Sequence, residues 1–579
     1  MKKRIRSLLL TMLCVVTVFS CLGFGSVYAE TEQSTISLAP GSDETSVNVN
    51  WYANTTEAGV VKYAPTSQLT SDGKLPATAK TVDAATGTAN KSGYNYFKAT
   101  LSDLAPATSY SYTLTNGSTE SPVYHFSTQA QGAFTFLFVG DPQIGAGSSN
   151  ADDTAKWNSA LQTMTENYPD SASLLSAGDQ VDNNSDEEQY EGYLNSTYMP
   201  NLINPTTVGN HDAGSNCYSQ HYNVANMSSD YGVTAAGGDS WFTYNNVLFM
   251  SLNDNDMSAA EHKAFMQDAI SKSQDASWKI VVMHHSMFTV ASHAYDDDII
   301  ARRNELPAIF KELGVDVVLD GHGHVYCRTY MMDGTNPMTD ASIYDNADYS
   351  SITNPAGILY VTANSGSGSK FYTIKEDNFP YARVKNQERV PNFSVVSVSD
   401  NSFKITTKRT TDLSDVDSFT IYKYDPADYA AVDAAIEKVN ALDPDKYEDF
   451  DTVTAAINAA VRDKLENEQD TVDGYAAAIE SAIAGLKLKS TDGGNTGNND
   501  NTGSDTGNDN TGSGKDNGTT KPDSGNTGKD GGKGTSKPAT GDTSNTAVPA
   551  AVAVSALGAA VVLIVRRRSV KAADRKQSR

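Results

Sequence analysis

The stretch VDVVLDGHGHVYCRTY, residues 315–330, decides the fold and the chemistry that we expect of this chain. A mostly apolar run at 315–319 is followed by His322 and His324, one residue apart. Side chains two positions apart lie on the same side of an extended strand, so both imidazoles can face one point beyond the strand. A metal ion is one explanation, and a loop with ordinary hydrogen bonds is another. The other ligands must come from elsewhere in the chain.

Four further apolar runs end on residues that can ligate a metal. FTFLFV precedes Asp141, LLSA precedes Asp179, TTV precedes Asn210 and His211, and KIVVM precedes His284. Open α/β sheets collect their ligands at the carboxyl ends of the strands, so these side chains should converge. Each Gly-Asp or Gly-Asn alone could be a simple turn, but the whole ordered set indicates a metal site.

Residues 131–424 alternate apolar runs with helical stretches, which predicts an α/β domain with buried sheets. FSVVSVS and FKITTK flank DNS near its end and predict a hairpin. We expect strands at 134–139, 173–177, 205–208, 247–252, 279–283, 316–319 and 358–362, and helices at 152–168, 257–273 and 299–313.

Residues 30–130 contain short alternating strands between turn residues, which predicts a β-sandwich. In LSDLAPATSYSYTLTNG, the spacing of Leu, Pro, Thr and two tyrosines resembles the tyrosine corner of fibronectin type III-like domains. We therefore expect Tyr110 and Tyr112 to be core or corner residues without a chemical role.

The ordered strand ends resemble those of the calcineurin-like metallophosphoesterases over about residues 131–424. HVYCRT at 324–329, with a β-sandwich before the catalytic domain, is most similar to the purple acid phosphatase branch. The resemblance implies a four-layer α+β sandwich fold and two metal ions. It assigns Asp141, Asp179 and His324 to the first ion, with Asp179 bridging to a second ion held by Asn210, His284 and His322.

Two positions depart from the family pattern. The superfamily often has Asp-x-His in its first block, but Gln143 stands in the place of that imidazole, and we include it as a candidate ligand. Purple acid phosphatases have a Tyr three residues after the bridging Asp, where this chain has Asp182. Oxygen-rich shells suit harder ions and imidazole also suits Zn, so we expect two divalent or trivalent ions among Fe, Mn and Zn.

The resemblance also implies the reaction, which is attack of a metal-bound hydroxide on a phosphate ester without a phosphoenzyme. His211 would stabilise or protonate the leaving oxygen. His293, nine residues after His284, would contact the substrate. Each of these two histidines could instead have a structural role.

The two ends of the chain predict its location. Residues 1–29 have basic residues, an apolar stretch and a small-residue end, which is typical of a secretory signal peptide. Residues 537–579 contain KPATGD, an apolar run at 547–565 that can span a bilayer, and three arginines. This order resembles the sorting signal that sortase cuts in Gram-positive surface proteins, although Lys537 replaces the usual Leu. A plain membrane anchor is the alternative.

Residues 425–490 and 491–536 lie between the catalytic domain and that end. The first has three Ala-rich helical segments, at 428–442, 450–466 and 472–487, which predict a small three-helix bundle. The bundle resembles the FIVAR-type repeat of bacterial surface proteins, which implies contact with cell-wall glycan; a spacer is the alternative. The second is a polar, low-complexity linker without apolar residues to fold on.

Composition narrows the function further. The net charge of −26 argues against a nucleic-acid-binding surface. Removal of the signal peptide leaves Cys217 and Cys327, too few for a disulfide framework, and whether they pair stays open.

We therefore expect a secreted cell-surface hydrolase, anchored to wall or membrane and processed by sortase, that dephosphorylates phosphomonoesters outside the cell. Its substrate would be a small molecule or a phosphoprotein. A phosphodiesterase or nucleotidase on the same site is one alternative, because the ligands do not encode the leaving group. A surface adhesin or wall-binding protein with an inactive catalytic fold is another.

Overall fold

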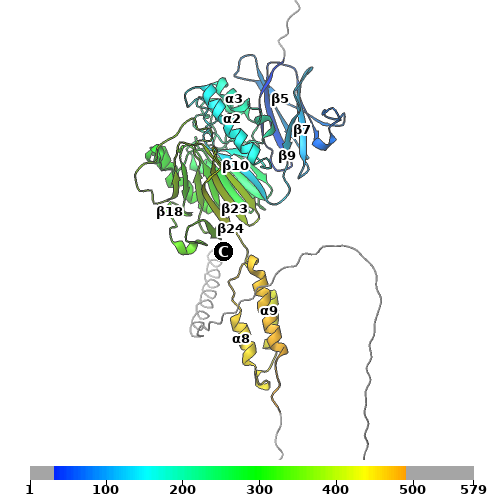
Figure 1. Cartoon of the computed structure of the whole chain (residues 1–579), viewed down its shortest axis with the longest axis vertical. Coiled ribbons are helices and arrows are strands. Elements are labelled where there is room, and N and C mark those ends of the chain that lie inside the picture. The colour runs from blue at the N-terminus through cyan, green and yellow to red at the C-terminus, as the bar shows by residue number, and fades with distance from the viewer. Residues whose placement is uncertain (1–30, 491–579) are drawn as a thin grey trace, which may run out of the picture. The chain divides into compact units, whose positions relative to one another are not determined.

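The structure is a computed structural model that describes residues 31–490. The predicted signal peptide, linker and sorting signal lie outside the described residues. In the part of the chain from 31 to 490, no helix combines the length and the apolar character needed to cross a membrane. Figure 1 follows three parts along the chain: strands in blue, a mixed α/β part from cyan to olive, and helices in yellow and orange.

The N-terminal part is the predicted β-sandwich. Its core is formed by side chains from both sheets, and Trp51 stacks on Phe97 with ring centroids 5.2 Å apart. One sheet has the order β1 (Gln33–Pro40), β2 (Val47–Ala53), β6 (Asn95–Leu101) and β5 (Ala85–Thr88). The other has β4 (Lys80–Asp83), β3 (Gly59–Pro65), β7 (Ser109–Asn116) and β8 (Thr119–Glu120), with β9 (Tyr124–Ser127) also paired to β7.

Both tyrosines of the β7 motif are buried, as the sequence predicts. The Oη of Tyr110 accepts a hydrogen bond from the backbone N–H of Ala105 at 2.8 Å, which is the geometry of a tyrosine corner. The hydroxyl of Tyr112 donates to the carbonyl oxygen of Pro200 at 2.5 Å. Tyr110 therefore fixes a turn of the sandwich, whereas Tyr112 joins the sandwich to the catalytic domain.

The catalytic domain is built on two sheets. In the larger one, β13, β14, β15 and β20 run parallel. Its order is β12 (Ser240–Tyr244), β13 (Val247–Ser251), β14 (Trp278–Val282), β15 (Val317–Asp320), β20 (Leu359–Thr362), β16 (Tyr326–Thr329) and β21 (Ala382–Asn386). The other sheet has the order β11 (Leu174–Ser176), β10 (Phe134–Val139), β22 (Asn392–Ser399), β23 (Ser402–Arg409), β24 (Asp415–Tyr422) and β19 (Ser351–Thr353).

Strand alternation sets the order of the layers. Phe136 and Phe138 of β10 join a core shared with the larger sheet, while Leu137 and Val139 face the helices on the other side. Helices α2 (Asn150–Asn167) and α3 (Glu187–Leu194) cover that side, and α5 (Ala259–Lys272) and α6 (Asp297–Leu313) cover the outer face of the larger sheet. The arrangement helix–sheet–sheet–helix is the predicted four-layer sandwich.

Two predicted elements differ in the structure. Residues 205–208 form no strand and contribute a single bridge, from Thr206 to Ser176, because Pro205 has no N–H to extend a ladder. The middle helix of the C-terminal bundle, α8 (Asp451–Ala459), is shorter than predicted, and Leu465 pairs with Pro426 instead. It packs with α7 (Ala430–Asn440) and α9 (Gln469–Ala484) around a common apolar core.

The two cysteines of the described chain are buried and unpaired, which answers the question that the sequence leaves open. The predicted hairpin is present, with Ser399 opposite Ser402.

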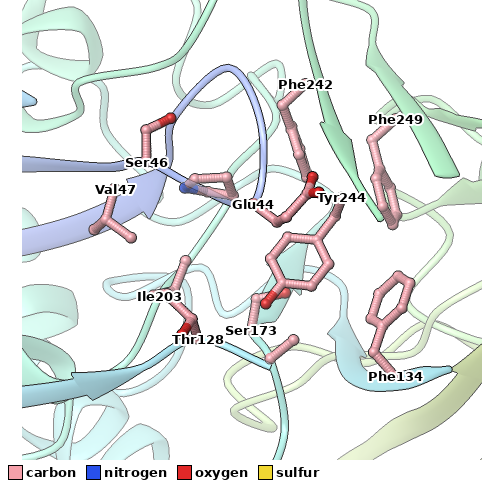
Figure 2. Close-up of a pocket in the computed structure, with 12 residues that line it drawn as sticks. Glu44, Ser46, Val47, Thr128, Phe134, Ser173, Ile203, Phe242, Tyr244 and Phe249 are labelled. Atoms are coloured by element: carbon pink, nitrogen blue, oxygen red, sulfur yellow. The ribbon is translucent and has the colours of Figure 1, made fainter. Parts of the chain in front are cut away.

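Figure 2 shows a mostly apolar pocket between the sandwich and the catalytic domain, and none of the candidate metal ligands lines it. Its labelled residues are Glu44, Ser46, Val47, Thr128, Phe134, Ser173, Ile203, Phe242, Tyr244 and Phe249.

Replacing Tyr110 with Phe tests the tyrosine corner. The ring keeps its packing, but the Ala105 N–H loses its acceptor, so the free energy of unfolding should fall by about 1–3 kcal/mol. Urea unfolding measures this free energy, and hydrogen exchange of the β7 amides reports the local effect. Tyr94→Phe is the control, because the Tyr94 hydroxyl donates to Glu32 in an exposed contact. Equal stability of the two variants would contradict a structural role for the corner.

Candidate metal centre

The candidate ligands lie just beyond the carboxyl ends of strands from both sheets. Asp141 follows β10, Asp179 follows β11, His284 follows β14 and His322 follows β15, each within three residues of the strand end. Each strand thus delivers its polar residue to the same edge of the domain, as the sequence predicts.

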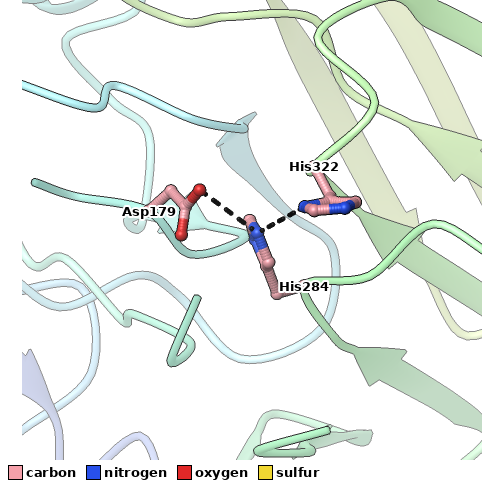
Figure 3. A group of neighbouring side chains, drawn as sticks. All are labelled: Asp179, His284 and His322. Carbon is pink, nitrogen blue, oxygen red and sulfur yellow. Dashed lines mark hydrogen bonds and ion pairs between the residues drawn. The ribbon is translucent and has the colours of Figure 1, made fainter. Parts of the chain in front are cut away.

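Two groups of donor atoms form there, and in each group all donors lie within 4.8 Å of one another. The first contains Asp179, His284 and His322, and the second contains Asp141, Asp179 and His324. Figure 3 shows His284 between its two neighbours: its Nε2 is 3.3 Å from Asp179 Oδ2 and 3.3 Å from His322 Nδ1. Only Asp179 belongs to both groups.

Asn210 and His324 extend these groups. The side-chain Oδ1 of Asn210 lies 3.0 Å from His284 Nε2, beside the first group. His324 Nε2 lies 3.5 Å from Asp141 Oδ1, within the second. The structure therefore brings together the six ligands that the family resemblance assigns.

Hydrogen bonds on the far side of each ring orient the histidines. His284 Nδ1 is 2.9 Å from the carbonyl oxygen of Ala177, and His324 Nδ1 is 3.0 Å from that of Lys370. Both Nε2 atoms consequently face the donor groups, which is how proteins commonly prepare metal-binding imidazoles.

The backbone at the site is unusual. Five of its residues adopt left-handed φ angles, which Asp and His tolerate better than bulky side chains but which still cost about 1–3 kcal/mol each. They are Asp141 (47°), Gln143 (37°), Asp179 (49°), His322 (60°) and His324 (44°). The turns are also tight, since a Cβ at Gly209 would lie 2.1 Å from Asp179 Oδ1. This explains the glycines that surround the ligands in sequence.

The buried carboxylates of the site give it the negative charge that a cation needs. Burial, with the nearby Asp179, raises the pKa of Asp141 to about 7. Burial alone would lower the pKa of His284, but Asp179 and Asp141 raise it to about 10. Without metal, the carboxylates thus hold a proton on His284, which a metal ion would displace.

His322 and His324 are ready to bind metal as neutral rings. Desolvation, with the neighbouring histidines, lowers the pKa of His322 well below its ordinary value. Burial and the Lys370 ammonium lower the pKa of His324 to about 3. In addition, the buried oxygens Asp141 Oδ2 and Gln143 Oε1 have no hydrogen-bond partner, so the residues fit a bound cation.

The two departures from the family pattern contact each other. Gln143 Nε2 donates to Asp182 Oδ1 at 3.0 Å, and Asp182 belongs to neither donor group. His211 Nδ1 lies 2.6 Å from the Asp182 carbonyl oxygen and 3.5 Å from its carboxylate. Asp182 therefore positions Gln143 and His211, and Gln143 keeps its amide oxygen free as a candidate ligand.

Both predicted catalytic histidines lie beside the donor groups. The His211 side chain is 30% exposed, and its backbone N–H donates to Asp179 Oδ1 at 2.9 Å. The His293 ring centroid lies 4.2 Å from that of His322. His293 is held between Asp296, 2.6 Å from Nδ1, and the hydroxyl of Tyr372, 3.2 Å from Nε2.

Two buried residues behind the site, Asp254 and Arg302, were not predicted from the sequence. The Asp254 carboxylate accepts the backbone N–H groups of His284 and His285 at 3.3 and 3.1 Å. Arg302 of α6 donates to the Asp254 carbonyl oxygen at 2.6 Å. Asp254 follows β13 in a run of Asn and Asp, and Arg302 lies in an ordinary amphipathic helix pattern, so neither position gives a sequence signal.

Comparison with known proteins agrees with this geometry. Residues 134–326 match the calcineurin-like phosphoesterase family, and residues 33–128 match the purple acid phosphatase N-terminal domain. The domain that holds the donor groups is thus similar to the calcineurin-like phosphoesterases. Both matches agree with the predicted phosphoesterase class, and the fold implies divalent metal ions.

Two relatives match parts of the chain. Purple acid phosphatase 17 of Arabidopsis thaliana is 40% identical over 67 residues, 12% of this chain and 18% of that protein. An uncharacterized protein of Mycobacterium tuberculosis is 24% identical over 214 residues, 33% of this chain and 38% of that protein. The chain thus spans less than half the length of these relatives.

A solved structure has the same fold. Purple acid phosphatase PPD1 from yellow lupin seeds superposes with a TM-score of 0.54 at 15% identity, over 68% of this chain and 75% of that one.

Asp179 and His324 should differ in their effect on metal content. Asp179→Asn removes a donor from both groups and should lose nearly all bound metal, whereas His324→Ala affects one group and should retain about half. Elemental analysis of purified full-length protein measures this, with the exposed His125→Ala as control. If Asp179→Asn keeps full metal and wild-type turnover, the shared-ligand assignment is wrong.

Iron loading should not turn the protein purple. In the resembling phosphatases that colour comes from a phenolate bound to ferric iron, but Asp182 occupies that position here. Tyr326 is buried and its hydroxyl donates to Asp417 at 2.8 Å, so it does not reach the donors. We expect no intense visible absorption band. A band that appears on iron loading and disappears in Tyr326→Phe or Tyr372→Phe would overturn this expectation.

Proposed function

We propose that this protein is an extracellular phosphatase that hydrolyses phosphomonoesters with two metal ions. The main support is the pair of donor groups that share Asp179. The proposed ligands are Asp141, Asp179, Asn210, His284, His322 and His324, with Gln143 as a further candidate.

Two ions that share a carboxylate would offset the charge of a phosphate and make water a nucleophile near neutral pH. The protein contributes position and protons. His211 can donate from Nδ1 to the Asp182 carbonyl oxygen, 2.6 Å away, which leaves Nε2 facing away from that contact. As an imidazolium, it would protonate the leaving oxygen from Nε2.

His293 would position the phosphate. Its two nitrogens contact Asp296 and Tyr372, and its ring lies against that of His322, so its place beside the donor groups is fixed. A fixed side chain binds an anion at a smaller entropic cost than a mobile one.

The proposed location rests on sequence alone. The predicted signal peptide at 1–29 and the sortase-like signal at 537–579 support export and attachment to wall or membrane. The resemblance of the helical bundle to the FIVAR-type repeat supports contact with wall glycan, and a spacer is the alternative. An inactive adhesin is disfavoured, because the phosphoesterase domain keeps both donor groups, and all of their residues except the partly exposed His322 are buried.

Assays with two aryl esters test the proposal. Full-length protein loaded with Mn, Zn or Fe should hydrolyse p-nitrophenyl phosphate with a kcat/KM at least about tenfold above that for bis-p-nitrophenyl phosphate. His322→Ala should abolish both activities, since it removes a ligand. A preference for the diester would favour the phosphodiesterase alternative, and inactivity on every ester with each metal would contradict the proposal.

A further inference from the structure

A Ser/Gly loop after β20, residues 364–369, is fastened to the segment that holds Asp141. The N–H of Gly366 donates to the carbonyl oxygen of Gly140 at 2.7 Å, and Ser365 Oγ donates to that of Asp141 at 3.0 Å. Ser369 Oγ donates to the carbonyl oxygen of Pro142 at 3.1 Å. Lys370 directly follows this loop, so its backbone is held at the edge of the metal site.

The position of Lys370 is defined from two sides. Its carbonyl oxygen is 3.0 Å from His324 Nδ1, and its ammonium lies 5.2 Å from the centroid of the Tyr372 ring. That ring is 4.9 Å from the His324 ring, and its hydroxyl is 3.2 Å from His293 Nε2. Lys370, Tyr372 and His293 thus form one wall beside His322 and His324.

The charge of Lys370 is not neutralised. Among residues 31–490 its ammonium has a contact only with the Tyr372 ring, and no carboxylate forms an ion pair with it. Its ammonium lies on the Tyr372 ring, which contacts both His324 and His293, so this charge stands beside the donor groups. An unpaired cation beside a metal centre is notable in a chain of net charge −26.

We propose that Lys370 binds the phosphoryl oxygens of the substrate and makes the site selective for a terminal phosphate dianion over a phosphodiester monoanion. This inference rests on the proposed function and names the residue behind its monoester preference. A terminal phosphate has a charge of about −1.5 to −2 near neutral pH, so it gains more from an added point charge than a diester does. Lysine binds phosphate as such a point charge.

Substitution of Lys370 tests this directly. Lys370→Met should weaken binding of inorganic phosphate to the metal-loaded protein by about 10- to 100-fold, the value of one charge-assisted hydrogen bond. The KM for p-nitrophenyl phosphate should rise by a similar factor with a smaller change in kcat, while kcat/KM for the diester changes by less than about threefold. Lys370→Arg should recover most of the affinity.

A matched control lies five residues further on. Lys375 is also a lysine over a tyrosine, 4.7 Å from the Tyr295 ring, and Lys375→Met should leave phosphate affinity unchanged. Elemental analysis must show full metal content in each variant. Unchanged phosphate affinity in Lys370→Met, an equal loss in Lys375→Met, or an equal loss for monoester and diester would overturn the inference.

Phosphate binding also separates this inference from the proposed function, because it requires no turnover. The metal-loaded wild type could hydrolyse no ester and still bind phosphate more tightly than Lys370→Met does. In that case the proposed function fails and phosphate recognition by Lys370 stands. If the wild type hydrolyses monoesters but binds no phosphate, recognition by Lys370 fails instead.

Discussion

Two buried carboxylates set the main constraint on this structure. Asp141 and Asp179 are enclosed, and each such charge costs several kcal/mol to bury unless an opposite charge and hydrogen-bond donors compensate it. The backbone N–H of His322 donates to Asp141 and that of His211 to Asp179, both at 2.9 Å. Much of the site serves to hold negative charge that only a cation fully balances.

Bringing the carboxylates and the imidazoles together requires strained backbone conformations. The tight turns after β10, β11 and β15 place ligands in left-handed conformations. Such strain persists only where the surroundings over-determine it. Two packed sheets supply this support, because the strand before each turn is buried on both faces, as Phe138 and Val139 of β10 illustrate. Fold stability and site geometry are therefore properties of the same strands.

The sequence predicted those features that depend on local pattern. Strand alternation, helix spacing and a polar residue after each apolar run predicted the β-sandwich, the α/β domain and the candidate ligands, whereas the four layers followed from the family resemblance. It could not show partners that come from distant segments without a pattern of their own. Asp254, Arg302 and Lys370 each look ordinary in sequence, since their contacts arise only when segments far apart in the chain meet.

Asp182 shows why departures from a family pattern are best interpreted together. Separately, the Gln at 143 and the Asp at 182 each replace a metal ligand of the resembling phosphatases. In the structure the Gln143 amide donates to the Asp182 carboxylate, and the same residue contacts His211. A Tyr at 182 could not accept that amide in the same way while binding a metal, and a His at 143 would bring a different donor set. The two changes are therefore compatible with each other. Where the resembling phosphatases have two ligands of the first ion, this chain has a hydrogen bond from Gln143 to Asp182, and Asp182 in turn contacts His211, the proposed general acid.

A double-mutant cycle at 143 and 182 should consequently show coupling in kcat, because each residue fixes the other.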